Sequence, residues 1–512
     1  MSQRCAILLT MATTAAFAAA QQPASEPRLP SGQQPNAYTL QVKAQEIVLD
    51  LVVTDSKGEP VTNLKRDDFQ IYEDKIPQVI DSLTPPPSHT ALSPAIHSTA
   101  ELDRAEPDAP VTLIVLDEIN TRFQDEAFAR YSVKRFLDGQ GDTMEHPTLL
   151  AAVDLNRLTL LSDYTTSKKD LLSALDRHFI AYPWHTEGTS WQVEQFDASF
   201  MALLEMAEAT SGHPGHKSLL WIGRGFPPFD PSGLTAPQSQ ALKQVIEACT
   251  NALRDSRVSL YTLDPAGVST EPPVLDSDGF ADDPFAQEVD FDAMARATGG
   301  HAFFGRNDVD KVIARSARDG ASFYTLAYRP SVPRTDIVTF HNIRVVVKQP
   351  GLRAETRQGY YSASADAPPA AATEKQPDLQ RLNFTVAAQS MMVYDAVHMS
   401  VEPVAGNPNE FRMILNAGDL TWQESGPGKL NTRVTVAAKT FSKKAAVDGT
   451  LKISTLQVNE ASAGKPATNT VSLLVNVPTK GPAVRVRFLV RDEGTGKLGA
   501  INYSLSTASS AR

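Results

Sequence analysis

The apolar positions of this chain follow three patterns in succession. Between residues 47 and 83, apolar and polar residues alternate over short segments separated by turn residues, and a period of two predicts β-strands. Between residues 111 and 328, continuous apolar runs alternate with segments in which apolar residues recur every three or four positions. These patterns predict buried strands and amphipathic helices. Beyond residue 379 we expect strands only, at a spacing typical of a β-sandwich.

The strongest single element is the apolar run Val111–Leu116, which ends in the polar sequence Asp117-Glu118-Ile119-Asn120-Thr121. A continuous apolar run of this length is typical of a strand buried on both faces. A helix is predicted directly after it, at 125–137. Polar side chains between such a strand and its helix lie at the carboxyl edge of the sheet, where open α/β folds bind ligands. This edge of the sheet is therefore the first candidate for a functional site.

The same alternation continues to residue 328. Strands are predicted at 148–154, 157–161, 218–222, 258–263, 302–304 and 323–328, and helices at 167–179, 191–210, 238–254, 291–298 and 309–318. Repeated strand–helix units predict an α/β domain with a mainly parallel sheet and helices on both faces. Strands at 343–348 and 354–360 would close this domain as a terminal hairpin.

Composition divides the chain into further segments. Residues 1–20 begin with Arg4, continue through small apolar residues and end in Ala18-Ala19-Ala20, which is the pattern of a secretory signal peptide. Residues 21–36 are predicted to be a disordered linker, and Pro-rich or Ala-rich linkers are predicted at 85–110 and 363–378. These leave a small β module at 37–84, the α/β domain at 111–362 and a β-sandwich at 379–510. No later run reaches the length of a membrane span, so we expect a periplasmic or extracellular protein.

The net charge disfavours one class of partner, and the cysteine content excludes an intramolecular disulfide. There are 48 lysines and arginines against 59 aspartates and glutamates, a net charge of −11 at pH 7, which disfavours nucleic acid as a partner. Removal of the signal peptide with Cys5 leaves Cys249 alone, so no intramolecular disulfide can form. Cys249 lies in a helical apolar pattern, and we expect a buried structural thiol.

Several motifs occur in a characteristic order along residues 45–361. They are Val53-Thr54-Asp55 with Asp67-Asp68-Phe69 and Tyr72-Glu73-Asp74, Leu116-Asp117 with Asn120-Thr121, Ala297-Thr298-Gly299-Gly300-His301-Ala302-Phe303, Phe323–Pro330, and Val347–Leu352 with Arg357–Tyr361. In this order the chain resembles secreted bacterial proteins with a von Willebrand factor A-related domain, the type abundant in Acidobacteria. The resemblance implies a Rossmann-like von Willebrand factor A domain between the β module and the β-sandwich.

The resemblance also implies a metal-ion-dependent adhesion site for Mg²⁺ or Ca²⁺. In the family, an Asp-x-Ser-x-Ser loop, a Thr from a second loop and an Asp from a third supply hard oxygen ligands. Asp117, Thr121 and Thr189 stand at matching positions in this chain. Ile119 replaces the first Ser, and Arg224 stands where the third loop would have its Asp. Ile119 cannot ligate a metal, and a guanidinium beside a divalent cation is repulsive.

Two interpretations of this loop remain open. In the first, Asp117, Thr121 and Thr189 bind Mg²⁺ or Ca²⁺. In the second, which Ile119 and Arg224 favour, the site is degenerate and Asp117 pairs with Arg224. Asn120 or Thr121 would then cap the following helix, and Glu118 would be solvated.

No catalytic residues can be assigned. His178, His185, His213 and His216 lack a zinc-binding pattern and are expected on surface loops, and no nucleophile elbow or phosphate-binding loop is present. The favoured hypothesis is a non-enzymatic, adhesion-type protein that meets an unidentified protein partner through the edge residues Asn120, Trp184, Trp191, Arg224 and Phe226. The alternatives are an envelope scaffold that works through its β-sandwich and an extracytoplasmic hydrolase. Trp184 and Trp191 could instead pack internally.

Overall fold

The computed structural model describes residues 46–86, 95–180, 189–228, 231–267, 285, 289–331, 339–362, 384–426, 429–442, 451–461, 469–477 and 483–505. The predicted signal peptide (1–20), the linker at 21–36 and the linker at 363–378 lie outside these residues. None of the helices in the described ranges is long and apolar enough to span a lipid bilayer.

A six-stranded sheet contains the apolar run singled out above. Its order is β10-β9-β8-β5-β6-β7. The strands are β5 (Val111–Asp117), β6 (Thr143–Asp154), β7 (Arg157–Ser167), β8 (Lys217–Ile222), β9 (Val258–Leu263) and β10 (Ala302–Phe303). All neighbours pair in parallel except β6 and β7, which form an antiparallel hairpin. The predicted mainly parallel sheet is confirmed.

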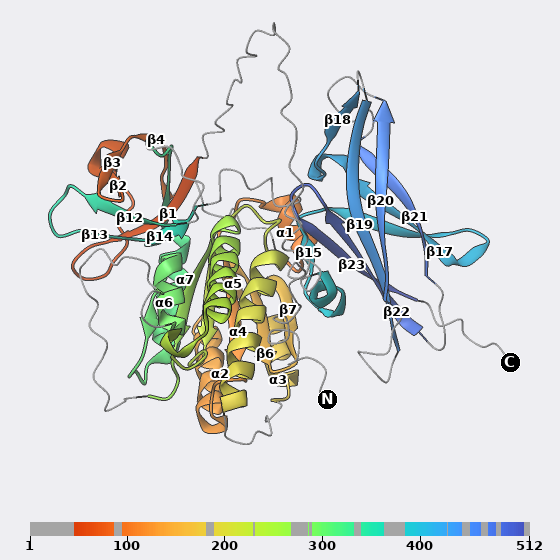
Figure 1. Ribbon diagram of the computed structural model, residues 1–512. Helices are drawn as coiled ribbons and strands as arrows, with labels where there is room; N and C mark the ends of the chain where they lie inside the picture. The colour runs from red at the N-terminus through yellow and green to blue at the C-terminus, as the bar shows by residue number, and fades with distance from the viewer. Residues whose placement is uncertain are drawn as a thin grey trace, which may run out of the picture. The chain divides into compact units, whose positions relative to one another are not determined.

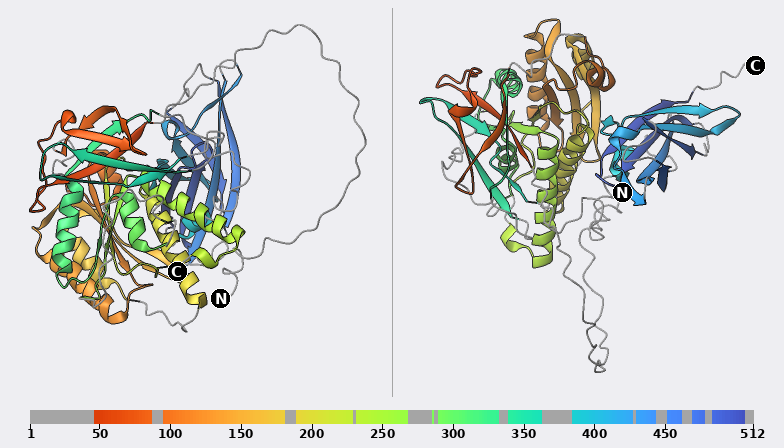
Figure 2. Two further views of the ribbon diagram at one scale, coloured as in Figure 1. Left: turned by 60° about the vertical axis from the view of Figure 1, so that its left-hand side comes forward. Right: turned by 90° about the horizontal axis from the view of Figure 1, so that it is seen from above.

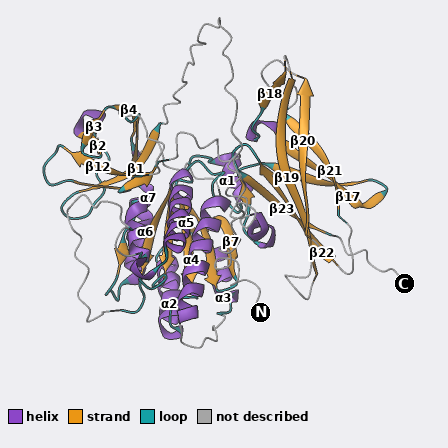
Figure 3. Ribbon diagram, in the orientation of Figure 1, coloured by secondary structure: helices purple, strands orange, loops and turns teal. Residues whose placement is uncertain are grey.

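Helices cover both faces of this sheet, as Figures 1 and 3 show. They are α1 (Thr99–Ala105), α2 (Phe123–Asp138), α3 (Lys168–Arg177), α4 (Thr189–Ala209), α5 (Ala236–Asp255), α6 (Phe291–Thr298) and α7 (Val309–Ala321). Leu113 and Val115 of β5 join the core that contains α4, α5 and α6. Ile114 and Leu116 join the second core, with α2, α3 and α7. Every residue of β5 is buried, which explains why its sequence is continuously apolar.

The predicted linker at 85–110 is wrong for its second half. Residues 95–110 contain α1, whose N-cap Ser98 accepts a hydrogen bond from the Glu101 amide. Ile96, Leu102 and Ala109 are buried in the core that α4 and α5 share. The proline content of this segment predicts a linker, but its few apolar residues are enough to pack it against the core.

The small β module draws strands from two distant parts of the chain. Its first part holds β1 (Ile47–Thr54), β2 (Phe69–Glu73), β3 (Ile76–Gln78) and β4 (Ile80–Thr84), and its second part holds β11 (Phe323–Tyr328), β12 (Phe340–Val347), β13 (Arg353–Thr356) and β14 (Gly359–Tyr361). They form the four-stranded sheets β13-β1-β11-β4 and β14-β12-β2-β3, which enclose one core.

The predicted α/β domain at 111–362 is therefore wrong in its last part, because its strands from β11 onward belong to the β module. We expected Phe323–Tyr328 to be a strand of the α/β domain, but it pairs antiparallel with β1, from Ile47 opposite Tyr328 to Val52 opposite Phe323. Apolar periodicity identifies a strand and its buried face, but the choice of partner depends on long-range packing.

The last part of the chain is mostly strand. It comprises β15 (Tyr394–Asp395), β16 (Met399–Val404), β17 (Asn407–Asn416), β18 (Gln423–Gly426), β19 (Lys429–Ser442), β20 (Leu451–Ala461), β21 (Thr470–Asn476), β22 (Ala483–Asp492) and β23 (Leu498–Ser504). Sheet β16-β17-β21 shares a core with the larger antiparallel sheet of β15, β18, β19, β20, β22 and β23; Figure 2 shows these strands from two further directions. Residues 384–389 are helical, although a strand was predicted there.

A buried ion pair joins the β module to the parallel sheet. Asp50 of β1 accepts hydrogen bonds from Arg257 Nε and Nη2 at 3.0 and 2.6 Å, from His216 Nδ1 at 3.1 Å and from Thr325 Oγ1 at 2.8 Å. Burial works to raise the pKa of Asp50, but the His216 hydrogen bond and the Arg257 charge outweigh it, so the pKa lies well below its ordinary value. The carboxylate is therefore charged and fully hydrogen-bonded.

Replacing Asp50 by Asn should lower the free energy of unfolding by about 3 kcal/mol, because the half-buried Arg257 would lose its counter-charge. Urea denaturation of the full chain measures this loss. The control is Asp81→Asn, which breaks the exposed pair with Arg329 (3.2 Å) and should cost less than about 1 kcal/mol. Equal losses in the two variants would contradict a special role for Asp50.

Candidate functional site

The Asp117 carboxylate lies at the carboxyl end of β5 and is 1% exposed. Its Oδ1 accepts hydrogen bonds from the amides of Ile119 and Asn120, both at 3.0 Å, and from Asn120 Nδ2 at 3.1 Å. Its Oδ2 accepts from Asn120 Nδ2, Trp221 Nε1 and the Gly225 amide, each at 3.0 Å. A carboxylate has about four lone-pair positions, so these N–H donors occupy all of them.

The predicted Asp117–Arg224 pair is wrong. Arg224 Nε instead donates to Asp264 Oδ2 at 3.0 Å, and the arginine side chain is 44% exposed. Asp117 receives uncharged donors in its place. Burial raises the pKa of Asp117, while the donors from Trp221, Asn120 and Gly225 work against that rise.

Two glycines bring the third loop against Asp117. A Cβ on Gly223 would lie 2.2 Å from the Asp117 Cβ and 2.6 Å from Thr121 Oγ1. Gly225 has a φ of +66°, and a Cβ there would lie 2.2 Å from Phe291 Cγ. Only glycine allows this approach, and it lets the Gly225 amide reach the carboxylate while the Arg224 side chain points away from it.

Asn120 and Thr121 do not cap the following helix as predicted. The N-cap of α2 is Arg122, and its side chain makes no capping bond. Asn120 Nδ2 instead links Asp117 to Ser199 Oγ of α4 at 3.0 Å. Asn120 Oδ1 and Thr121 Oγ1 are buried atoms without a hydrogen-bond partner among the described residues.

These contacts fit an Mg²⁺ or Ca²⁺ site poorly. Thr121 Oγ1 is an available hard oxygen, and the side chain of Thr189 is outside the described residues. A cation, however, needs a lone pair on Asp117, and N–H groups point at that carboxylate from three segments. Ile119 is buried and apolar, so it supplies no replacement ligand.

Glu118 is buried, contrary to the prediction that it is solvated. It is 3% exposed, and it forms an ion pair with His178, the residue directly after α3. The pair joins the end of β5 to the end of α3, so His178 has a structural partner rather than a loop position in solvent.

Glu126, in the first turn of α2, is a buried acid that sequence reasoning missed. It is 3% exposed, and its Oε1 has no hydrogen-bond partner in the described chain. Burial, followed by the charges of Glu118 and Asp117, raises its pKa to about 8. Glu126 is therefore protonated at neutral pH, which lets three acids share this edge.

The predicted edge residues separate into different environments. Phe226 is 2% exposed and stacks on Phe200 with ring centroids 5.1 Å apart, so it is a core residue and not a contact residue. Trp191 is partly buried, and Trp184 lies outside the described residues. Among the residues of the predicted surface that the structure describes, Arg224 is the one that is exposed.

Other apolar side chains are exposed at this edge. Phe123, Phe179, Val193 and Phe304 are 52%, 89%, 54% and 41% exposed. Phe123 begins α2, and Phe179 follows His178. Phe304 directly follows β10. Val193 lies six residues before Ser199, so it is about 9 Å beyond the Asn120 contact. We call Phe123, Phe179, Val193, Arg224 and Phe304 the carboxyl-edge surface.

The remaining predicted histidines and the cysteine are structural where they are described. His213 Nε2 lies 2.7 Å from the Ala109 carbonyl oxygen, and His216 bonds Asp50. Both are buried, so their predicted surface position is wrong; His185 lies outside the described residues. Cys249 is free and buried as expected, and burial raises the pKa of its thiol.

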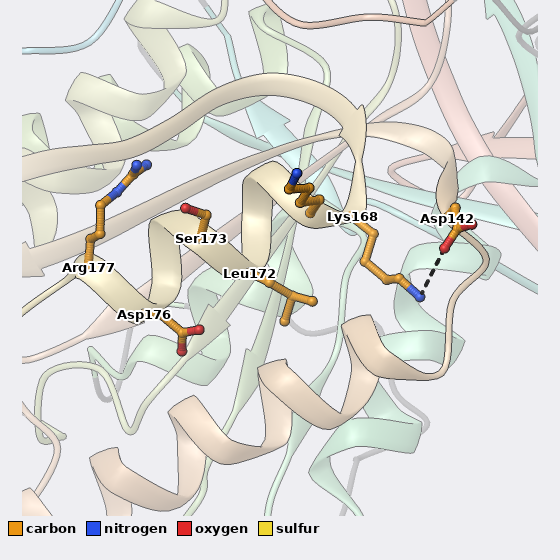
Figure 4. A pocket seen from close by; sticks show the side chains of 7 residues that line it. Asp142, Lys168, Leu172, Ser173, Asp176 and Arg177 are labelled. Carbon is orange, nitrogen blue, oxygen red and sulfur yellow. Dashed lines mark ion pairs between the residues drawn. The ribbon is translucent and has the colours of Figure 1, made fainter.

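A separate depression lies along α3 (Figure 4). It is lined by Asp142, Lys168, Lys169, Leu172, Ser173, Asp176 and Arg177. Lys168 and Asp142 pair across it at 3.9 Å. No residue of the Asp117 cluster lines it, and its mixed charges select no ligand class.

Comparison with solved structures yields matches of low similarity. Proximal thread matrix protein 1 from the mussel byssus is 11% identical over 46% of this chain and 51% of its own, with a TM-score of 0.27. A second crystal form of that protein is 9% identical over 30% and 37%, with a TM-score of 0.20. The SpRpn10 VWA domain is a weak neighbour, 16% identical over 32% of this chain and 90% of its own, with a TM-score of 0.17. No protein-family model and no curated protein sequence matches the chain.

Glu126→Gln should stabilise the protein more at pH 8 than at pH 5. The folded protein holds the Glu126 proton up to about pH 8, whereas the unfolded chain releases it near the ordinary value of 4.5. Stability is therefore lost as pH rises through this window, by on the order of 4 kcal/mol, and Gln removes the loss. Thermal denaturation at several pH values measures it. Gln124→Ala, at an exposed position in the same turn, is the control, and a pH-independent effect of Glu126→Gln would contradict the assignment.

Proposed function

We propose that this chain is an exported, non-enzymatic binding protein whose α/β part is a von Willebrand factor A-related domain with a degenerate metal site. In this proposal the carboxyl-edge surface binds a protein partner without a metal ion. The observation that carries it is the Asp117 carboxylate, whose lone pairs are all used by N–H donors from its own loop, from Trp221 and from Gly225.

The exposed side chains of the same edge support the choice of a protein partner. Phe179 and Val193 are more than half exposed and flank the buried Asp117 cluster. Aromatic and arginine side chains are the residues that most often dominate binding energy in protein interfaces. Arg224, held by Asp264, adds a charged group beside them.

The protein should give no heat of binding when Mg²⁺ or Ca²⁺ is titrated into the chelator-treated full chain. The physical reason is that a cation would have to displace several hydrogen bonds from Asp117. Isothermal titration calorimetry checks this. Clear binding that disappears in Asp117→Ala would contradict the proposal that the metal site is degenerate.

Partner binding should depend on the carboxyl-edge surface. The double variant Phe179→Asp/Val193→Asp should reduce capture of the same partner from the native envelope fraction at least about tenfold, because each change places a charge in a desolvated contact. Capture by the parent chain should be unchanged by chelator.

Two exposed apolar residues outside this edge supply matched controls. Val79 in the β module and Leu474 in β21 are 79% and 59% exposed, and Val79→Asp and Leu474→Asp should leave capture intact. Loss of capture in Leu474→Asp, with the edge variant still active, would instead favour the scaffold function through the C-terminal sheets.

A further inference from the structure

A small polar cavity lies at the opposite end of the parallel sheet from Asp117. The centre of a water-sized sphere can occupy about 30 Å³ of it, more than the roughly 10–15 Å³ that holds one water molecule. The cavity lining includes Asp50, His216, Arg254, Arg257 and Arg357. Val258 at the start of β9 and Gly359 of the β module also line it, so two parts of the fold form the cavity.

The cavity lining carries more positive than negative charge. Three of its residues are arginines and one is an aspartate. Asp50 is already saturated by Arg257, His216 and Thr325. It therefore neutralises Arg257 and has no hydrogen-bonding capacity left for the other two guanidinium groups.

Arg254 is held mainly by groups outside the cavity. Its Nε donates to Asp255 Oδ1 at 2.8 Å, and the Asp255 side chain is 66% exposed. Its Nη1 makes a long contact of 3.4 Å with the Tyr361 carbonyl oxygen, and its guanidinium lies 5.8 Å from the centre of the Tyr360 ring. The pair with Asp255 is solvent-screened, so it compensates the Arg254 charge only in part.

Arg357 has a buried donor that no acceptor reaches. Its Nε is buried and has no hydrogen-bond partner among the described residues. Burial and the neighbouring Arg254 charge lower its pKa to about 10, while the charges of Asp50 and Asp255 work against that change. An arginine does not release its proton in a protein, and a buried donor requires an acceptor.

We propose that this cavity binds one small inorganic anion of chloride size, held by Arg357 and Arg254. The anion supplies the acceptor that Arg357 Nε lacks and the negative charge that the cavity lining lacks. The cavity has room for a single-atom anion such as chloride. Because residues of both the β module and the parallel sheet line the cavity, the bound anion stabilises the contact between them.

Thermal denaturation of the full chain in sodium chloride and in sodium gluconate of equal ionic strength tests the proposal. Chloride should raise the Tm by about 2 °C for each tenfold increase above its dissociation constant, and gluconate, a much larger anion, should not. Equal Tm values in the two salts would overturn the proposal and leave the cavity to a water molecule.

Arg357→Gln should abolish the chloride dependence and leave the Tm in gluconate unchanged or higher, since it removes a buried donor that has no acceptor. Arg353→Gln, at an exposed position of β13, should keep the full chloride dependence. If both variants lost the chloride dependence of the Tm equally, that dependence would come from general electrostatic screening, and the proposed site would be wrong. Crystals soaked in sodium bromide add a direct measurement, in which an anomalous peak beside Arg357 is expected and its absence contradicts the proposal.

Discussion

The arrangement of the carboxyl edge depends on how one buried carboxylate is hydrogen-bonded. Asp117 ends a strand that is buried on both faces, so water cannot solvate its charge. Donors must come from the protein, and they come from its own loop, from Trp221 of β8 and from the Gly225 amide. This need brings Gly223 and Gly225 against β5, and it directs Arg224 outward to Asp264.

The same hydrogen bonding leaves the polar groups of this edge buried and apolar side chains exposed around them. Glu118 is paired with His178, and Glu126 keeps its proton, so the protein itself reduces the repulsion among the three acids. Phe179 and Val193 remain exposed around them. An exposed apolar rim suits contact with another protein, whereas the Asp117 carboxylate offers a small ligand no free lone pair. The proposed function rests on this division.

A second buried polar cluster, around Asp50, lies at the opposite end of the sheet. Asp50 holds Arg257 and His216 where β1 meets the parallel sheet, and Arg357 Nε is left without an acceptor. The β module is thereby tied to the α/β part by charge as well as by strand exchange. The proposed anion would complete this contact, and the two proposals then assign partner binding to one end of the sheet and cohesion to the other.

The sequence by itself determined the secondary structure of the α/β region, because apolar periodicity and burial are local properties of β5 and α2. It also placed Asp117 at a strand end and Cys249 in a core. Only the tertiary structure decided that β11 pairs with β1, that Arg224 contacts Asp264 and that Phe226 is buried. Those outcomes depend on residues far apart in the chain competing for the same partner. No local pattern encodes such a competition, because its result is set by which groups can be buried and hydrogen-bonded at once.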